Sequence, residues 1–277
     1  MSTRLSLGYS PCPNDTFIFH ALTHGLIESA ADLEFVVLLD DVEALNRSAA
    51  AGRLDVAKVS YHAYGHISSD YVMLRSGGAL GRGVGPLVVA RTPGLDLRGK
   101  RVAVPGGRTT AKLLLELWRP EGLELEELRY DAIIPAVAGG EVDAGLIIHE
   151  SRFTYMAHGL LALVDLGAWW EGEVGELVPL GAIVARRSLG AAMHTRLAGL
   201  VRASLEYAWR RPGASTEYVA ANAQEMSEEV RRQHIALYVN DYSLDVGVDG
   251  ERAARRLLER GLSRGLFPAL REPIFAA

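Results

Sequence analysis

The sequence has few of the features that mark secreted, membrane-spanning or nucleic-acid-binding proteins. It contains a single cysteine, Cys12, which excludes an internal disulfide framework and a cysteine-based zinc site. A run of about 18 apolar residues, as a membrane-spanning helix needs, does not occur. The net charge of -5 argues against a nucleic-acid partner, because phosphate binding requires a concentrated excess of Lys and Arg.

An amino-terminal targeting segment is missing from the pattern as well. Residues 1–5 lead directly into a strand-like alternation, without an apolar signal core or a small-residue cleavage site. A cytoplasmic protein without membrane contact is therefore the expectation.

What the sequence contains is the composition of a folded α/β protein. Its 277 residues, 49% of them apolar and 23% charged, suit one large domain or two of ordinary size. Strand-like and helix-like segments alternate, which predicts a mainly parallel sheet with crossover helices. We expect strands at 4–9, 33–39, 55–60, 71–75, 86–91, 101–104, 128–130, 144–148 and 179–186. We expect helices at 16–26, 42–51, 110–118, 133–138, 191–210, 215–223, 227–239 and 249–262.

Two similar apolar strands bracket a self-contained α/β segment. Residues 86–91 and 179–186 both begin at a proline and end in Val-Ala-Arg. This pattern suggests an inserted domain, with a larger lobe formed by 1–88 and 185–277 and a smaller lobe formed by 89–184. A chain that crosses twice between lobes leaves a cleft, where ligands of α/β proteins tend to bind.

The turn at 10–15 is the first candidate ligand site. It follows a predicted strand and precedes a predicted helix, so its free backbone N–H groups can bind an anion or a polar group. Asn14 or Asp15 is the expected N-cap of that helix. An ordinary strand-to-helix turn remains the alternative.

The segment 104–111 is a second candidate, with the same position between strand and helix. Two glycines let the backbone turn, and Thr109 and Thr110 open the helix. Their hydroxyl and N–H groups would point at one spot and bind an anion there. The alternative is simple capping of the helix.

His149 follows the predicted strand 144–148 and precedes a polar turn. Ionisable groups at the carboxyl end of a strand are common catalytic groups in α/β proteins, although a histidine that only caps a turn fits equally well. For Cys12 the spacing implies no histidine partner, so a buried unreactive thiol is expected.

Two histidine pairs have the i, i+4 spacing of a metal clamp: His20 with His24, and His62 with His66. Neither pair belongs to an H-E-x-x-H motif or has a third ligand nearby, so we expect surface or cleft-rim histidines and no metal. The glycine-rich stretch 76–85 lacks the G-x-G-x-x-G order and precedes a strand, so no dinucleotide cofactor is expected.

Three long motifs resemble those of the 1,4-dihydroxy-6-naphthoate synthases, which belong to the futalosine pathway of menaquinone biosynthesis. These motifs are Ser10-Pro-Cys-Pro-Asn-Asp-Thr-Phe-Ile-Phe19, residues 76–91, and Gly145-Leu-Ile-Ile-His-Glu-Ser-Arg-Phe-Thr-Tyr155. The similarity extends over essentially the whole chain.

The resemblance implies a two-lobed fold like that of type II periplasmic binding proteins, with a mixed sheet flanked by helices in each lobe and the ligand cleft between them. It also implies a lyase that converts cyclic dehypoxanthinyl futalosine into 1,4-dihydroxy-6-naphthoate. That reaction consists of base-initiated carbon–carbon cleavage and aromatisation, needs no cofactor, and acts on a small molecule with an aromatic carboxylate.

The same resemblance assigns roles to residues. His149 matches the proposed base of the family, and Ser60, Thr109 and Thr110 match its ligand contacts. The turn that holds Asn14 and Asp15 is expected to contribute further substrate contacts.

Two other functions remain open. A small-carboxylate-binding protein of transport type shares the fold, although the chain shows no signal peptide. The chorismate-dehydrating enzyme of the same pathway is similar in size and fold, although the quoted motifs fit it less well.

Overall fold

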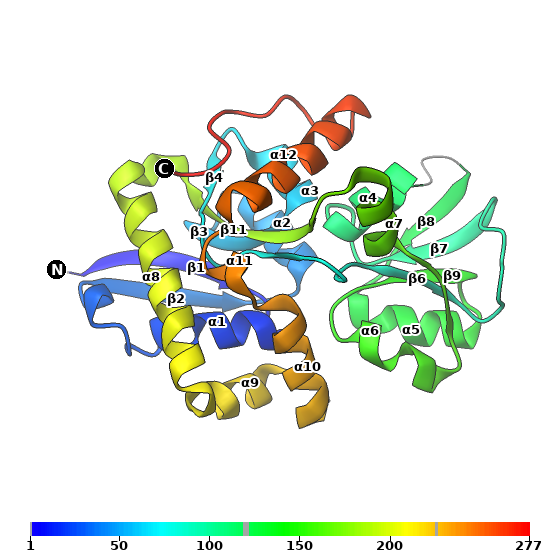
Figure 1. Ribbon diagram of the computed structural model, residues 1–277, viewed down its shortest axis with the longest axis horizontal. Helices are drawn as coiled ribbons and strands as arrows, with labels where there is room; N and C mark the ends of the chain where they lie inside the picture. Colours follow the sequence, from blue (N-terminus) through cyan, green and yellow to red (C-terminus); the bar gives the residue numbers. More distant parts are fainter. Residues whose placement is uncertain (1, 119–121, 225–226) are drawn as a thin grey trace.

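Two β-sheets organise the chain, and they lie side by side in Figure 1. The computed structural model describes residues 2–118, 122–224 and 227–277. Its first sheet consists of β1 (Thr3–Tyr9), β2 (Leu33–Leu39), β3 (Val56–Ser60), β4 (Tyr71–Met73), β5 (Ala79–Gly81) and β11 (Val178–Arg186). Their order is β2-β1-β3-β11-β4, with β5 paired to β11.

The second sheet forms the other lobe. It consists of β6 (Leu87–Ala90), β7 (Lys100–Val104), β8 (Leu123–Glu127), β9 (Ala144–Ile147) and β10 (Leu161–Asp165), in the order β10-β6-β9-β7-β8. The expected lobe boundaries at 88/89 and 184/185 fall inside strands β6 and β11. Strand β6 lies wholly in the second sheet and β11 wholly in the first.

Both sheets are mixed, as the family resemblance implies. β1 pairs in parallel with β2 and β3, whereas β11 runs antiparallel to β3 and β4. β7 pairs in parallel with β8 and β9, whereas β6 runs antiparallel to β9 and β10. The mainly parallel sheet predicted from the alternation is therefore wrong. The chain enters β6 and β11 from the other lobe, so no crossover helix within the same sheet dictates their direction.

Helices cover the faces of both sheets (Figure 1). Those of the first lobe are α1 (Pro13–Thr23), α2 (Val42–Ala50), α3 (Tyr61–Ile67), α8 (Ala191–Arg210), α9 (Thr216–Asn222), α10 (Glu228–Tyr238), α11 (Asp241–Leu244) and α12 (Gly247–Ser263). Those of the second lobe are α4 (Thr110–Trp118), α5 (Tyr130–Gly139), α6 (Ser151–Thr154) and α7 (Leu166–Val174). None of the helices in the described ranges is both long and apolar enough to span a membrane.

Several elements differ from the sequence expectations. Helix α1 starts at Pro13 with Cys12 as its N-cap, so the prediction of Asn14 or Asp15 as the cap is wrong. Proline suits the first helical position because its φ is already helical and its missing N–H would have no partner there. The strand expected at 128–130 is instead β8, whose Leu-Glu-Leu-Glu-Glu sequence makes a charged edge strand. Strands β5 and β10 and helices α3, α6, α7 and α11 were not expected.

Parallel strands bring the candidate residues together. Ser10 follows the carboxyl end of β1, and Ser60 is the last residue of β3. In the second sheet, Thr109 comes shortly after β7 and His149 shortly after β9. Four parallel-strand ends therefore face the space between the lobes, two from each sheet.

Candidate active site

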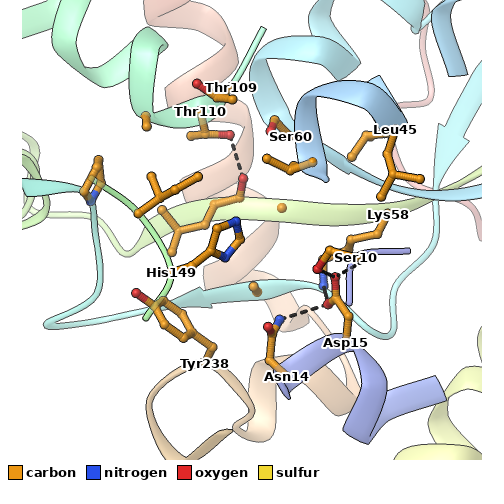
Figure 2. Close-up of a pocket in the computed structure, with 18 of the residues that line it drawn as sticks. Ser10, Asn14, Asp15, Leu45, Lys58, Ser60, Thr109, Thr110, His149 and Tyr238 are labelled. Carbon is orange, nitrogen blue, oxygen red and sulfur yellow. Dashed lines mark hydrogen bonds and ion pairs between the residues drawn. The ribbon is translucent and has the colours of Figure 1, made fainter. Parts of the chain in front are cut away.

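A pocket lies between the lobes where these strand ends meet (Figure 2). It is lined by all six residues that the sequence proposed for the site: Asn14, Asp15, Ser60, Thr109, Thr110 and His149. Its volume is about 90 Å³, enough for a few water molecules. A drug-sized ligand needs about 300 Å³ or more.

A buried ion pair forms one wall of the pocket. Lys58 Nζ lies 2.9 Å from Asp15 Oδ1, and the two side chains are 6% and 4% exposed. Ser10 Oγ donates to Asp15 Oδ2 at 2.8 Å, and Asn14 Nδ2 donates to Asp15 Oδ1 at 2.9 Å. Every oxygen of Asp15 is thus committed, so this carboxylate positions its neighbours rather than taking part as a base.

Lys58 was missed as a site residue in the sequence analysis. Its strand, Val-Ala-Lys-Val-Ser, is buried at all five positions. A lysine in a strand that is otherwise apolar was the signal, because a buried lysine requires a partner.

The three predicted hydroxyl groups have different hydrogen-bonding states. Thr110 Oγ1 donates to the Leu180 carbonyl at 2.6 Å and accepts from the Tyr61 N–H at 2.9 Å. Thr109 Oγ1 donates to the Gly106 carbonyl at 3.1 Å. Ser60 Oγ accepts from Asn46 Nδ2 at 3.3 Å, and no acceptor for its hydroxyl hydrogen is found in the described ranges. Of these three described groups, Ser60 is therefore the one with a hydroxyl hydrogen to offer a ligand.

The threonines can still contribute through their backbone. Helix α4 starts at Thr110, so the N–H groups of its first turn have no intrahelical acceptor. In the part of the chain that the structure describes, the N–H groups of Thr109, Thr110 and Ala111 have no protein partner, and all three residues line the pocket. The positive end of the α4 dipole adds to this anion-binding potential.

His149 has a strained backbone. Its φ is 56°, and among the described residues no other non-glycine residue has a positive φ. Such conformations cost free energy and are concentrated at functional sites. In Figure 2 the His149 ring lies in the middle of the pocket, between Thr110 on one side and Asn14 on the other.

The surroundings of His149 keep its ring neutral. Burial lowers the pKa of His149, and a negative charge on Glu150 or Asp15 would act against this shift. The Tyr130 ring contacts it edge-on, with 5.2 Å between centroids. A neutral imidazole that faces a pocket is able to accept a proton.

Helix α10 contributes His234 and Tyr238, which the sequence analysis did not propose. His234 is fully buried, its Nε2 lies 3.0 Å from Asn14 Oδ1, and its ring is nearly parallel to that of His149 at 6.2 Å. These residues lie more than eighty positions from His149 in a charged amphipathic helix. The only signal was a histidine on the apolar face of that helix.

Cys12 has a histidine neighbour after all. The ligand-type atoms of Cys12, His149 and Glu150 lie within 4.8 Å of one another, which the spacing in the sequence did not reveal. Burial raises the pKa of the Cys12 thiol well above its usual value. The thiol is therefore protonated and a poor metal ligand, and the absence of a metal requirement stays a prediction.

The two histidine pairs lie away from the pocket lining. The expectation of surface or cleft-rim positions is wrong for His20 and His62, which are buried and only 8% and 3% exposed. His62 Nδ1 lies 3.3 Å from the Thr109 carbonyl, so this histidine forms a hydrogen bond to the residue that precedes α4.

The two mixed sheets with a pocket between them define a protein of the periplasmic-binding-protein fold. The alkanesulfonate-binding protein SsuA of Xanthomonas axonopodis has this fold with a TM-score of 0.73, at 16% identity over 96% of this chain and 95% of its own. Protein AF1704 of Archaeoglobus fulgidus is more similar, with a TM-score of 0.90 and 36% identity over 95% of this chain and 98% of its own.

Sequence comparison identifies the family. The model of the menaquinone biosynthesis family matches residues 5–262. A 1,4-dihydroxy-6-naphthoate synthase of Thermus thermophilus is 56% identical over 98% of both chains. An enzyme of the same name from Streptomyces coelicolor is 51% identical over 96% of this chain and 95% of its own. The chain belongs to the menaquinone biosynthesis family.

Proposed function

We propose that this protein is a lyase that forms 1,4-dihydroxy-6-naphthoate in menaquinone biosynthesis, with cyclic dehypoxanthinyl futalosine as its substrate. The activity is that of the two relatives, which align over nearly their whole length at more than half identity. The observation that carries the mechanism is His149, a neutral imidazole held in a strained conformation inside the inter-lobe pocket.

The aromatic carboxylate of the substrate binds on the Ser60 side of the pocket. The free hydroxyl hydrogen of Ser60 and the unpartnered N–H groups at the start of α4 converge there. Hydrogen bonds to a charged acceptor are stronger than neutral ones, and a helix N-terminus adds a favourable dipole. In Figure 2, Ser60 and Thr109 lie on the opposite side of His149 from Asn14 and Asp15.

His149 then starts the reaction as a general base. Its neutral ring accepts a proton from a hydroxyl group of the ribose-derived part, and the electron pair of that O–H bond forms a carbonyl. The adjacent carbon–carbon bond breaks, and its electron pair passes to the departing three-carbon fragment, which is protonated in turn. Aromatisation of the remaining ring makes this sequence favourable. Exclusion of water by the lobes protects the carbanionic intermediate.

Substrate entry requires the lobes to separate. The pocket holds about 90 Å³, which is far below the space that a bicyclic substrate occupies. Thr110 ties α4 to the first lobe through Leu180 and Tyr61, so these contacts change when the cleft opens.

The alternatives are separated by one assay. A transport-type binding protein shares only the fold, at 16% identity. The purified protein is incubated with cyclic dehypoxanthinyl futalosine or with chorismate, and naphthoate absorbance is followed. We expect naphthoate from the first compound alone. Turnover of chorismate, or binding of both without turnover, would overturn the proposed function.

A further inference from the structure

Two buried polar atoms beside His149 face each other without a hydrogen-bond partner. They are Glu150 Oε2 and His234 Nδ1, which belong to the few orphaned side-chain atoms in the described ranges. The two atoms are 4.0 Å apart, with side-chain exposures of 12% for Glu150 and 0% for His234. An unpartnered buried polar atom is costly, so this arrangement requires an explanation.

The hydrogen-bond network fixes the tautomer of His234. Asp15 can only accept hydrogen bonds, so the Asn14 atom next to it is the amide nitrogen, and Asn14 Oδ1 faces His234. His234 Nε2 must therefore carry the hydrogen that Asn14 Oδ1 accepts. Burial lowers the pKa of His234 well below its usual value, so its Nδ1 presents a lone pair to Glu150.

An ionised Glu150 would place a second lone pair against the first. Two acceptors at 4.0 Å repel each other, and both atoms are closed off from solvent. One hydrogen between them satisfies both atoms, and a small side-chain rotation brings them to hydrogen-bond distance.

The other ionisable groups around this pair are neutral or already paired. Cys12, Tyr130 and Tyr238 remain protonated, because burial raises the pKa of each. Asp15 pairs with Lys58, and Arg152 pairs with Asp165 at 2.6 Å.

One more charge acts on His149 from a distance, that of Asp41. Its carboxylate accepts hydrogen bonds from two N–H groups at the start of α2, at 2.9 and 3.2 Å. Among the described residues, Glu150 is therefore the group whose protonation decides the local field at His149.

We propose that the Glu150 carboxyl carries a proton and donates it to His234 Nδ1, so that this buried pair keeps negative charge away from His149. The inference rests on the proposed role of His149 as the base. An ionised Glu150 would raise the pKa of His149 and so favour the imidazolium, which cannot accept a proton. Glu150 and His234 are thus positioning residues that keep the base neutral.

The first test measures the hydrogen bond itself, independently of activity. The full-length protein is labelled with ¹⁵N-histidine, and the ring nitrogens are observed at pH 7, with His234 assigned by its loss in His234→Gln. We expect the Nδ1 signal of a hydrogen-bond acceptor in the wild type and in Glu150→Gln, whose amide replaces the carboxyl donor. In Glu150→Leu, which has no donor, the signal should move to that of a bare lone pair. Identical signals in the wild type and Glu150→Leu would overturn the proposal.

The second test is the pH dependence of turnover in Glu150→Gln. If the carboxyl is protonated, the amide mimics it, and the acidic limb of the pH–rate profile stays where it is. If Glu150 is ionised, its loss lowers that limb by about one pH unit or more, which refutes the proposal.

Glu116→Gln is the matched control. Its Oε2 is also buried without a hydrogen-bond partner, but its Oε1 pairs with Lys112 within α4, and both measurements should match the wild type. Should His149→Asn keep full turnover, the role of His149 fails, whereas the ¹⁵N result still decides whether the proton lies between Glu150 and His234.

Discussion

Because of His62, the free energy of unfolding of the protein should fall as the pH drops below about 6.5. It lies in α3, is 3% exposed, and its Nδ1 donates to the Thr109 carbonyl at 3.3 Å. Burial, together with the positive charges of His66 and Lys112 when they are present, lowers the pKa of His62 to about 4. The His62 ring therefore takes up a proton at about pH 4 in the folded protein, but near pH 6.5 in the unfolded chain.

The sign and size of the effect follow from this difference. Above pH 6.5 the ring is neutral in both states, and its contribution to stability is fully present. As the pH falls below 6.5, the unfolded state gains the proton first, and about 1.4 kcal/mol of stability is lost per pH unit until the folded pKa is reached. Between pH 7 and pH 5, the protonation of His62 alone should thus lower the free energy of unfolding by about 2 kcal/mol.

The measurement compares urea unfolding of the wild type and His62→Asn at pH 7 and pH 5. Asparagine keeps an N–H donor near the Thr109 carbonyl but cannot titrate. We expect the variant to lose about 2 kcal/mol less than the wild type over this interval. His158→Asn, at an exposed histidine, serves as the control and should follow the wild type. Equal losses in the wild type and His62→Asn would refute the reasoning, because burial would then not hold the ring in its neutral form.

Five further outcomes are expected. His149→Asn should bind substrate but lose about 10²–10⁴-fold in turnover, and retained turnover would assign the base elsewhere; asparagine also tolerates the left-handed backbone of this position. Ser60→Ala should weaken substrate binding about tenfold or more, as seen in KM or calorimetry, since it removes a hydroxyl hydrogen that has no acceptor among the described residues. Thr110→Val should instead lower the free energy of unfolding, and an unchanged stability with tenfold weaker binding would contradict this. Asp15→Asn should cost about 3–5 kcal/mol in urea unfolding, partly recovered by adding Lys58→Met; a cost below about 1 kcal/mol would mean that the buried pair is not ionised. Small-angle scattering should show compaction when product is added, and an unchanged radius at saturation would indicate a preformed site.

Local patterns were sufficient for most of the fold. The apolar strands at β3, β6 and β11 and the long helix at 191–210 are set by short-range periodicity, which the sequence displays directly. The misplaced β8 shows where such patterns fail. An edge strand with glutamates at alternate positions resembles a solvated helix or loop, and only its pairing with β7 makes it a strand.

The candidate site was predictable where a residue lies at the end of a strand. His149, Ser60 and Thr109 belong to such ends, and the rule that parallel strands present their carboxyl ends at one edge places them together. The hydrogen-bonding state of each group was not predictable from the sequence. The Thr110 hydroxyl, for example, donates its hydrogen bond to the carbonyl of Leu180, seventy residues further along the chain.

The partners of His149 show why the remaining part of the site depends on tertiary structure. Asn14 and His234 are 220 residues apart, and their hydrogen bond exists only because α10 returns to pack against α1. That bond fixes the tautomer of His234, the tautomer leaves a lone pair facing Glu150, and the lone pair requires a hydrogen there. Each step depends on the one before it. The protonation of Glu150, next to the base, is therefore determined by the contact between Asn14 and His234. Neither the spacing nor the composition around His149 contains that information.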